Sequence, residues 1–202
     1  ALLSFLVGAV VAFLGATVLR DFGAAIFTVE LVSYSFLREF GVLLTAILLA
    51  GRSGSAFTAQ IGSMKSREEL DAIQTRGLDA IELLVLPRLR ALLVMLPVLT
   101  FIAMLMGLIG GGLVGSMALD ITPAMFITRL HAMTELHHFW VGMVKAPIFA
   151  FLIAVVGCLE GIKVEGSAES VGRHTTASVV QSIFMVILIL AMFALWFLEM
   201  KL

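Results

Sequence analysis

The chain has 202 residues, of which 61% are hydrophobic and 13% charged, and its mean hydropathy is +1.12. Soluble domains typically carry about 25% charged residues, so this composition excludes an ordinary soluble domain. The formal net charge of −1 gives no electrostatic reason to expect nucleic acid as a partner. A membrane-spanning helix needs roughly 20 apolar residues, which leaves room for about five spans. We therefore predict an all-α integral membrane protein that forms a single transmembrane domain over residues 1–202.

The first span is predicted over residues 1–19, where the chain is already apolar and carries no initiator methionine. We therefore expect upstream residues that this sequence lacks. The second span is predicted over Glu30 to Ala50. Beyond it, small residues recur every fourth position at Gly54, Thr58 and Gly62, which places a smooth strip on one helix face. Such strips let transmembrane helices approach closely, so we predict a packing surface there.

Two charged residues, Arg38 and Glu39, fall inside the second span if that helix begins near Glu30. A charge at bilayer depth costs roughly 2.5–3.5 kcal/mol on insertion scales, so such residues normally face a cavity or a partner. Together with Tyr34 they would then line a polar notch in an apolar cavity. If the helix begins later, near Phe36, the pair lies at the membrane interface instead. The sequence leaves both interpretations open.

A polar segment over about residues 63–86 interrupts the apolar chain. Five basic and five acidic residues lie within residues 65–90. This mixture favours a helix that contacts protein over a patch that binds nucleic acid. Ser66 and Glu69 have the spacing of a capping box, which predicts a short amphipathic helix over residues 67–75. We interpret this helix as a docking element; a solvated helix without a partner is the alternative.

The third span is predicted over about residues 83–114, and Pro97 is expected to kink it. Gly107, Gly111 and Gly115 double the spacing of the G-x-x-x-G motif inside it. This glycine face predicts a closely packed neighbouring helix.

A less apolar connector follows the third span. A short interfacial helix is expected from Pro123 onward, with Asp120 or Thr122 as its cap. The connector also carries three histidines whose spacing matches no usual zinc pattern, so we predict interfacial histidines and no metal site: His131, His137 and His138.

The fourth span is predicted over residues 139–159 and carries Lys145 near its start. This lysine either extends its amine to the interface or faces the cavity, where it would meet an acidic headgroup or Glu39. A polar, glycine-rich loop is expected over residues 160–176, and the last span over residues 177–198.

Lysines and arginines in the loops predict the orientation, because short cytosolic loops carry an excess of them. The loop after the second span holds five and the loop after the fourth span two: Lys65, Arg67, Arg76, Arg88 and Arg90, then Lys163 and Arg173. The opposite side holds three, Arg20, Arg129 and Lys201. Both even-numbered loops are therefore predicted to lie in the cytosol.

The sequence contains no G-x-x-x-x-G-K-[ST] nucleotide motif and no recognisable set of nucleophile, base and orienting acid. We therefore predict that the chain is not an enzyme by itself. Five spans are also few to enclose a transport pathway alone, so a homodimer that packs through small-residue faces is expected.

Three separated blocks of the chain resemble the MlaE/YrbE-type permeases of lipid-transporting ABC systems. They are LREFG, then GRSGSAFTAQIGSMKSREELDAIQTRGLDAIELLVLPRLRA, then KAPIFAFLIAVVGCLEGIKVEGSAESVGRHTTASVVQS, in family order. Two features differ from the family pattern. The family commonly has Gly-x-Asp-Pro where this chain has Gly77-Leu78-Asp79-Ala80, and an acidic residue usual in the last span is missing around residues 187–190.

The resemblance implies a permease subunit in the bacterial inner (cytoplasmic) membrane that moves phospholipid between the inner and outer membranes. It further implies a homodimer, a separate cytosolic ABC ATPase that holds ATP and magnesium, a periplasmic MCE-domain protein and a STAS-domain subunit as partners. No cofactor is expected in this chain. The family's N-terminal interfacial helix lies outside this sequence.

Combining both lines of reasoning, we predict an apolar cavity between two copies that holds acyl chains. Its expected lining is Tyr34, Leu37, Arg38, Glu39 and Lys145. The expected coupling helix would contact the ATPase through Ser66, Arg67, Glu68, Glu69, Leu70 and Ile73. The alternative is an ATP-independent secondary transporter or a membrane scaffold. A secondary transporter would be expected to show an internal repeat, and we find none in the sequence.

Overall fold

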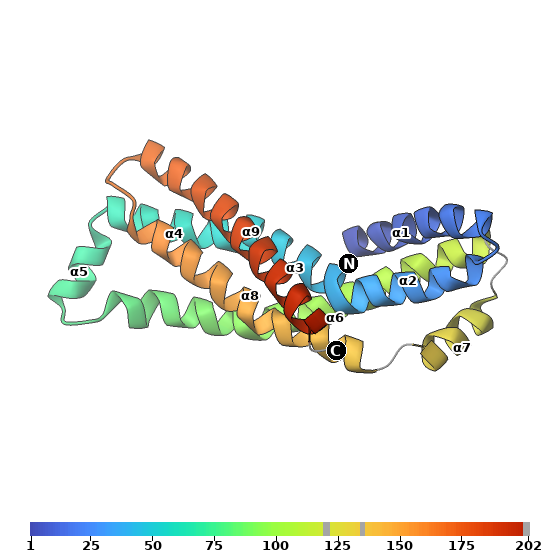
Figure 1. The fold of residues 1–202 in the computed structure, drawn as a ribbon. Helices are drawn as coiled ribbons and strands as arrows, with labels where there is room; N and C mark the ends of the chain where they lie inside the picture. Colours follow the sequence, from blue (N-terminus) through green and yellow to red (C-terminus); the bar gives the residue numbers. More distant parts are fainter. Residues whose placement is uncertain (119–121, 134–135, 200–202) are drawn as a thin grey trace. The chain divides into compact units, whose positions relative to one another are not determined.

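The computed structural model describes residues 1–118, 122–133 and 136–199, which are helical apart from short turns (Figure 1). Within these residues, five helices are long and apolar enough to cross a membrane. They are Leu2–Asp21, Thr28–Ser66, Ile81–Met117, Leu136–Ile162 and Ala168–Phe197. The prediction of an all-α membrane protein with about five spans is confirmed.

The first helix is α1 (Leu2–Asp21), and a 3-10 turn, η1 (Ala25–Phe27), leads into the second. The second long helix is continuous but changes its winding along its length: α2 (Thr28–Ser35), the π-helical η2 (Phe36–Phe40), α3 (Gly41–Leu49), the π-helical η3 (Ala50–Gly54) and α4 (Ser55–Ser66). The remaining elements are α5 (Glu69–Thr75), the π-helical η4 (Ile81–Val85), α6 (Leu86–Ala118), α7 (Pro123–Met133), α8 (Leu136–Ile162) and α9 (Ala168–Glu199).

The chain divides into two compact units. Unit 1 comprises Ala1–Thr45 and Pro97–Lys145, and unit 2 comprises Ala46–Leu96 and Ala146–Leu202. In unit 1, α1, α2 and the second half of α6 pack together, with Ala12, Val32 and Phe36 at the core. The close approach depends on glycine, because a Cβ atom on Gly8 would lie 2.1 Å from the carbonyl oxygen of Gly107.

Unit 2 packs α4 against α8 and α9 (Figure 1). Ile61, Leu70 and Cys158 form a buried cluster there. A Cβ atom on Gly157 of α8 would lie 2.9 Å from the carbonyl oxygen of Gly54, and the Thr58 hydroxyl donates to the carbonyl oxygen of Gly157 at 2.8 Å. The small residues therefore bring the backbones of the two helices into close contact.

The predicted capping box at Ser66 is wrong. α4 continues to Ser66, whose hydroxyl donates to the Gly62 carbonyl oxygen at 2.7 Å within the same helix. The chain then turns at Glu68, which adopts a left-handed conformation with φ of 59°, and α5 begins at Glu69 without a side-chain cap. The hydroxyl serves the helix that ends there, so it is not available to the helix that begins next.

The predicted loop over residues 160–176 is mostly helical, and only a short turn separates Ile162 from Ala168. Polar side chains make this possible by capping the new helix. The backbone amide of Ser170 donates to the Ser167 hydroxyl at 3.1 Å, so Ser167 caps α9. The helix start near Pro123 is confirmed. The Thr122 hydroxyl accepts from the amide of Met125 at 3.3 Å, whereas the other expected cap, Asp120, lies outside the described residues.

Candidate functional site

The candidate site in unit 1 begins with a strip of polar residues on the second long helix. Glu30, Tyr34 and Arg38 are spaced four residues apart, so they follow one face of α2 into η2. The helix begins at Thr28, which places Arg38 and Glu39 well inside it rather than at its start.

Each part of this polar strip meets a residue from α7 or α8. The Nη1 atom of Arg129 on α7 lies 3.5 Å from Oε1 of Glu30. The rings of Tyr34 and His138 lie 4.1 Å apart between centroids. The pairing continues in η2, where Lys145 on α8 approaches Glu39.

The Lys145 ammonium is the most deeply buried charge at this site. Its side chain is 0% exposed, and Nζ donates to Oε1 of Glu39 at 2.7 Å and to the carbonyl oxygen of Arg38 at 3.1 Å. An ammonium taken out of water needs a nearby negative charge and hydrogen-bond acceptors, and both come from η2. The Nε atom of Arg38 lies 3.9 Å from the same Glu39 oxygen.

The second carboxylate oxygen of Glu39, Oε2, is buried and has no hydrogen-bond partner among the described residues. Buried polar atoms in folded proteins are nearly always satisfied, so an unsatisfied acceptor indicates a place where a donor from outside the chain can bind. A hydroxyl or ammonium group of a ligand would supply that donor.

The π-helical winding of η2 depends on close packing around it. A Cβ atom on Gly41 would lie 2.5 Å from Cγ of Met104, and one on Gly142 would lie 2.0 Å from the Leu37 carbonyl oxygen. Glycines at these positions let α6 and α8 approach η2. Short π-helical segments inside α-helices are frequent at functional sites, which agrees with the charged cluster here.

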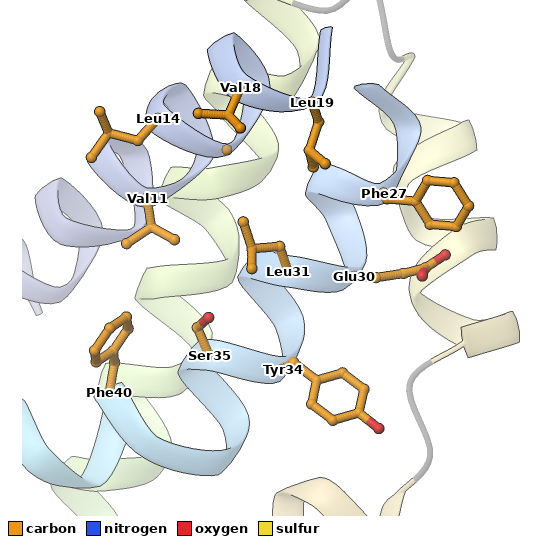
Figure 2. Close-up of a pocket in the computed structure, with 11 residues that line it drawn as sticks. Val11, Leu14, Val18, Leu19, Phe27, Glu30, Leu31, Tyr34, Ser35 and Phe40 are labelled. Carbon is orange, nitrogen blue, oxygen red and sulfur yellow. The ribbon is translucent and has the colours of Figure 1, made fainter. Parts of the chain in front are cut away.

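An apolar groove of about 860 Å³ lies between α1 and α2 beside the polar strip (Figure 2). Glu30 and Tyr34 belong to both the strip and the groove. The side chains of Leu31 and Ser35 lie on the α1 side of α2, whereas Glu30 and Tyr34 project to its other side. Its lining is mainly aliphatic and aromatic: Val11, Leu14, Gly15, Val18, Leu19, Phe27, Glu30, Leu31, Tyr34, Ser35 and Phe40.

The structure brings together most of the residues expected at the cavity. Arg38, Glu39 and Lys145 form one cluster, and Tyr34 lines the groove. Leu37 is buried beneath α8, and it is not among the residues that line the groove. The roles of these five residues remain predictions.

Sequence reasoning missed the contributions of Glu30, Arg129, His138 and the apolar face of α1. The four-residue spacing from Glu30 through Tyr34 to Arg38 was the available signal. The partners on α7 and α8 could not be found this way, because they lie about 100 residues away in the chain.

The residues expected to contact an ATPase lie in unit 2, and the structure divides them into two groups. Arg67, Glu68 and Glu69 are exposed. Leu70 is buried in the chain's own core, Ile73 is half-buried, and Ser66 belongs to α4. A partner could reach the charged residues, whereas Leu70 anchors α5 to its own unit.

The predicted glycine faces lie against neighbouring helices. Cβ atoms on Gly107 and Gly111 would lie within 2.5 Å of Phe36 and Val32 on the second helix, and one on Gly62 would lie 2.7 Å from Val164. No group of histidine, cysteine or acidic side chains suited to a metal ion occurs in the parts that the structure describes.

The five apolar helices and the buried charges define a multi-pass helical membrane protein. A family model described as "Permease MlaE" matches residues 1–196. The chain belongs to the MlaE permease family.

Curated relatives carry permease names. A probable ABC transporter permease protein of Synechocystis sp. is 38% identical over 80% of this chain and 62% of its own length. A probable ABC transporter permease protein of Rickettsia bellii is 34% identical over 93% of this chain and 73% of its own length. The intermembrane phospholipid transport system permease protein MlaE of Haemophilus influenzae is 32% identical over 90% of this chain and 70% of its own length. The chain thus spans less than two thirds of the Synechocystis relative and about seven tenths of the other two.

Proposed function

We propose that this chain is the membrane permease subunit of an ABC-type transporter that moves phospholipid between the inner and outer membranes. The observation that carries the proposal is the apolar groove between α1 and α2 with a polar strip along its edge. Its volume of about 860 Å³ lies within the range of roughly 300–1,000 Å³ typical of small-molecule sites. The names of the ABC permease relatives and of the phospholipid permease from Haemophilus influenzae support the same function.

The groove and the strip suit the two parts of a phospholipid. Acyl chains would lie against the aliphatic side chains of α1 and α2, and burial contributes about 0.8 kcal/mol per methylene group. The headgroup would lie along the polar strip, where Lys145 and Glu39 offer a donor and an acceptor. Because such burial holds a lipid tightly, its release must be driven.

A separate ATPase would drive release. The exposed charges of the α4–α5 turn, Arg67, Glu68 and Glu69, would dock in that ATPase, which holds ATP and magnesium; this chain would hold no cofactor. Two copies of the chain would enclose the cavity. In this proposal the complex lies in the bacterial inner membrane, with a periplasmic MCE-domain protein and a STAS-domain subunit as further partners.

Native mass spectrometry of the complex, extracted gently from its own host through a tagged copy of this chain, tests the proposal. We expect two copies of the chain, two ATPase subunits and bound phospholipid. Recovery of the chain without an ATPase, under conditions that preserve other membrane complexes, would overturn it. That result would favour an ATP-independent secondary transporter or a scaffold.

A further inference from the structure

We propose that Arg129 and Glu30 form a headgroup site for a zwitterionic aminophospholipid, in which Arg129 binds the phosphate and Glu30 binds the ammonium. The inference rests on the proposed function, because it names the lipid class that the groove takes. It begins from a contact between α7 and α2, where Nη1 of Arg129 lies 3.5 Å from Oε1 of Glu30.

The Arg129–Glu30 pair is weak enough to open. The two side chains are 31% and 26% exposed, and the distance lies at the limit of a hydrogen bond. Partly exposed ion pairs typically contribute only about 0–1 kcal/mol to stability. A ligand that offers better geometry to either partner can therefore displace the other at little cost.

Arg129 has the chemistry to bind a phosphate. A guanidinium carries five N–H donors in a planar fork that matches two phosphate oxygens at once. Glu30 engages this fork through a single long contact to Nη1, and no other hydrogen bond of Arg129 is present among the described residues. Most of its donor capacity thus remains available to a ligand.

Glu30 connects this pair to the groove. It lines the groove together with Tyr34 and Ser35, the other polar side chains in an otherwise apolar lining. Figure 2 shows Glu30 and Tyr34 projecting to one side of α2, away from the face that meets α1. A lipid whose acyl chain lies in the groove would therefore carry its headgroup past Glu30 and Arg129.

Charge complementarity selects the headgroup. A lone carboxylate at the groove would repel a phosphate, and a lone guanidinium would favour any anionic lipid. The paired charges instead match a headgroup that carries both a phosphate and an ammonium. When the phosphate engages Arg129, the ammonium becomes the new partner of Glu30, so neither protein charge loses its counter-ion.

The experiment measures lipid binding to the full complex from its own host by native mass spectrometry in detergent. The probes are phosphatidylethanolamine and phosphatidylglycerol with identical acyl chains. For the unmodified complex we expect a preference for phosphatidylethanolamine. Arg129→Gln should weaken binding of both lipids about tenfold, because it removes a charge-assisted hydrogen bond.

Glu30→Gln gives the sharper result. It leaves Arg129 without its carboxylate and removes the ammonium partner, so the preference should reverse toward phosphatidylglycerol. Arg129→Lys keeps the charge but loses the fork, and its affinity should fall between the other two. Arg173→Gln, an exposed arginine of α9 outside the site, is the matched control and should change neither affinity nor preference.

Each outcome separates the inference from the function on which it rests. If the unmodified complex binds neither lipid, the proposed function fails. If it binds lipid and all three site variants keep its affinity and preference, the headgroup site fails while the function stands. If Arg129→Gln does not fold, Arg129→Lys and Glu30→Gln still decide. Displacement of bound lipid by inorganic phosphate at equal concentration would also overturn the site, because it would indicate a site for free phosphate.

Discussion

Each of the two units buries a glutamate beside a lysine, but they satisfy it differently. In unit 2, Glu160 is 3% exposed, and its two oxygens lie 2.8 Å from Nζ of Lys163 and 2.8 Å from Nδ1 of His174. In unit 1, Glu39 meets Lys145 and Arg38 through Oε1, whereas Oε2 is buried without a hydrogen-bond partner among the described residues.

This difference separates a structural charge from one suited to a ligand. The Glu160 cluster ties the end of α8 to the start of α9 with both oxygens in use. Glu39 keeps one acceptor in reserve at the polar strip. The cost of that unsatisfied oxygen has no structural return within the described residues, which supports a role in binding.

The largest effect is expected from Lys145→Met. The substitution leaves Glu39 buried without its closest cation, which should cost about 3–5 kcal/mol in the free energy of unfolding. Thermal unfolding in detergent measures the loss. The double variant with Glu39→Gln should recover most of the stability but not lipid transport. A single variant as stable as the unmodified protein would remove the pair from the buried core.

Glu160→Ala should destabilise the protein through unit 2 without affecting the lipid. It removes two charge-assisted hydrogen bonds, each worth about 1.5–3 kcal/mol, so we expect a loss of roughly 3 kcal/mol in the free energy of unfolding. Lipid affinity of the folded complex should stay unchanged by native mass spectrometry. A clear loss of affinity would mean that the comparison between the two glutamates is misdrawn.

Gly142→Ala tests the packing that supports Glu39. The added Cβ would lie 2.0 Å from the Leu37 carbonyl oxygen, so α8 must move away from η2, at a cost of about 1–3 kcal/mol. Gly172→Ala in α9 is the control. Its Cβ would meet nothing within 4 Å, and alanine should stabilise the helix by about 1 kcal/mol. Opposite shifts in the unfolding temperature are expected, and equal shifts would contradict the close approach.

The smallest effect on stability is expected from charge reversal at the α4–α5 turn. Glu68→Lys with Glu69→Lys changes exposed residues, so the free energy of unfolding should move by less than about 0.5 kcal/mol. Lipid-stimulated ATP hydrolysis by the complex should nevertheless fall. Leu70→Ala is the contrasting variant, because its buried side chain should cost about 2–5 kcal/mol. Normal stimulation in the double reversal would remove this turn from the ATPase contact.

The sequence by itself determined the class, the spans and the packing faces. Apolar length predicts transmembrane helices because every backbone polar group in a bilayer must be bonded within the chain. Helix ends were less predictable at Ser66 and over residues 160–176, because polar residues can either end a helix or cap and extend it.

Only the tertiary structure decided which charges meet. Glu39 and Lys145 are more than 100 residues apart, as are the elements that carry Tyr34 and His138, and no local period connects them. The groove likewise depends on how α1 lies against α2, which spacing within one helix does not encode. Periodicity places a residue on a face of its own helix, but the partner across that face follows from packing of the whole unit.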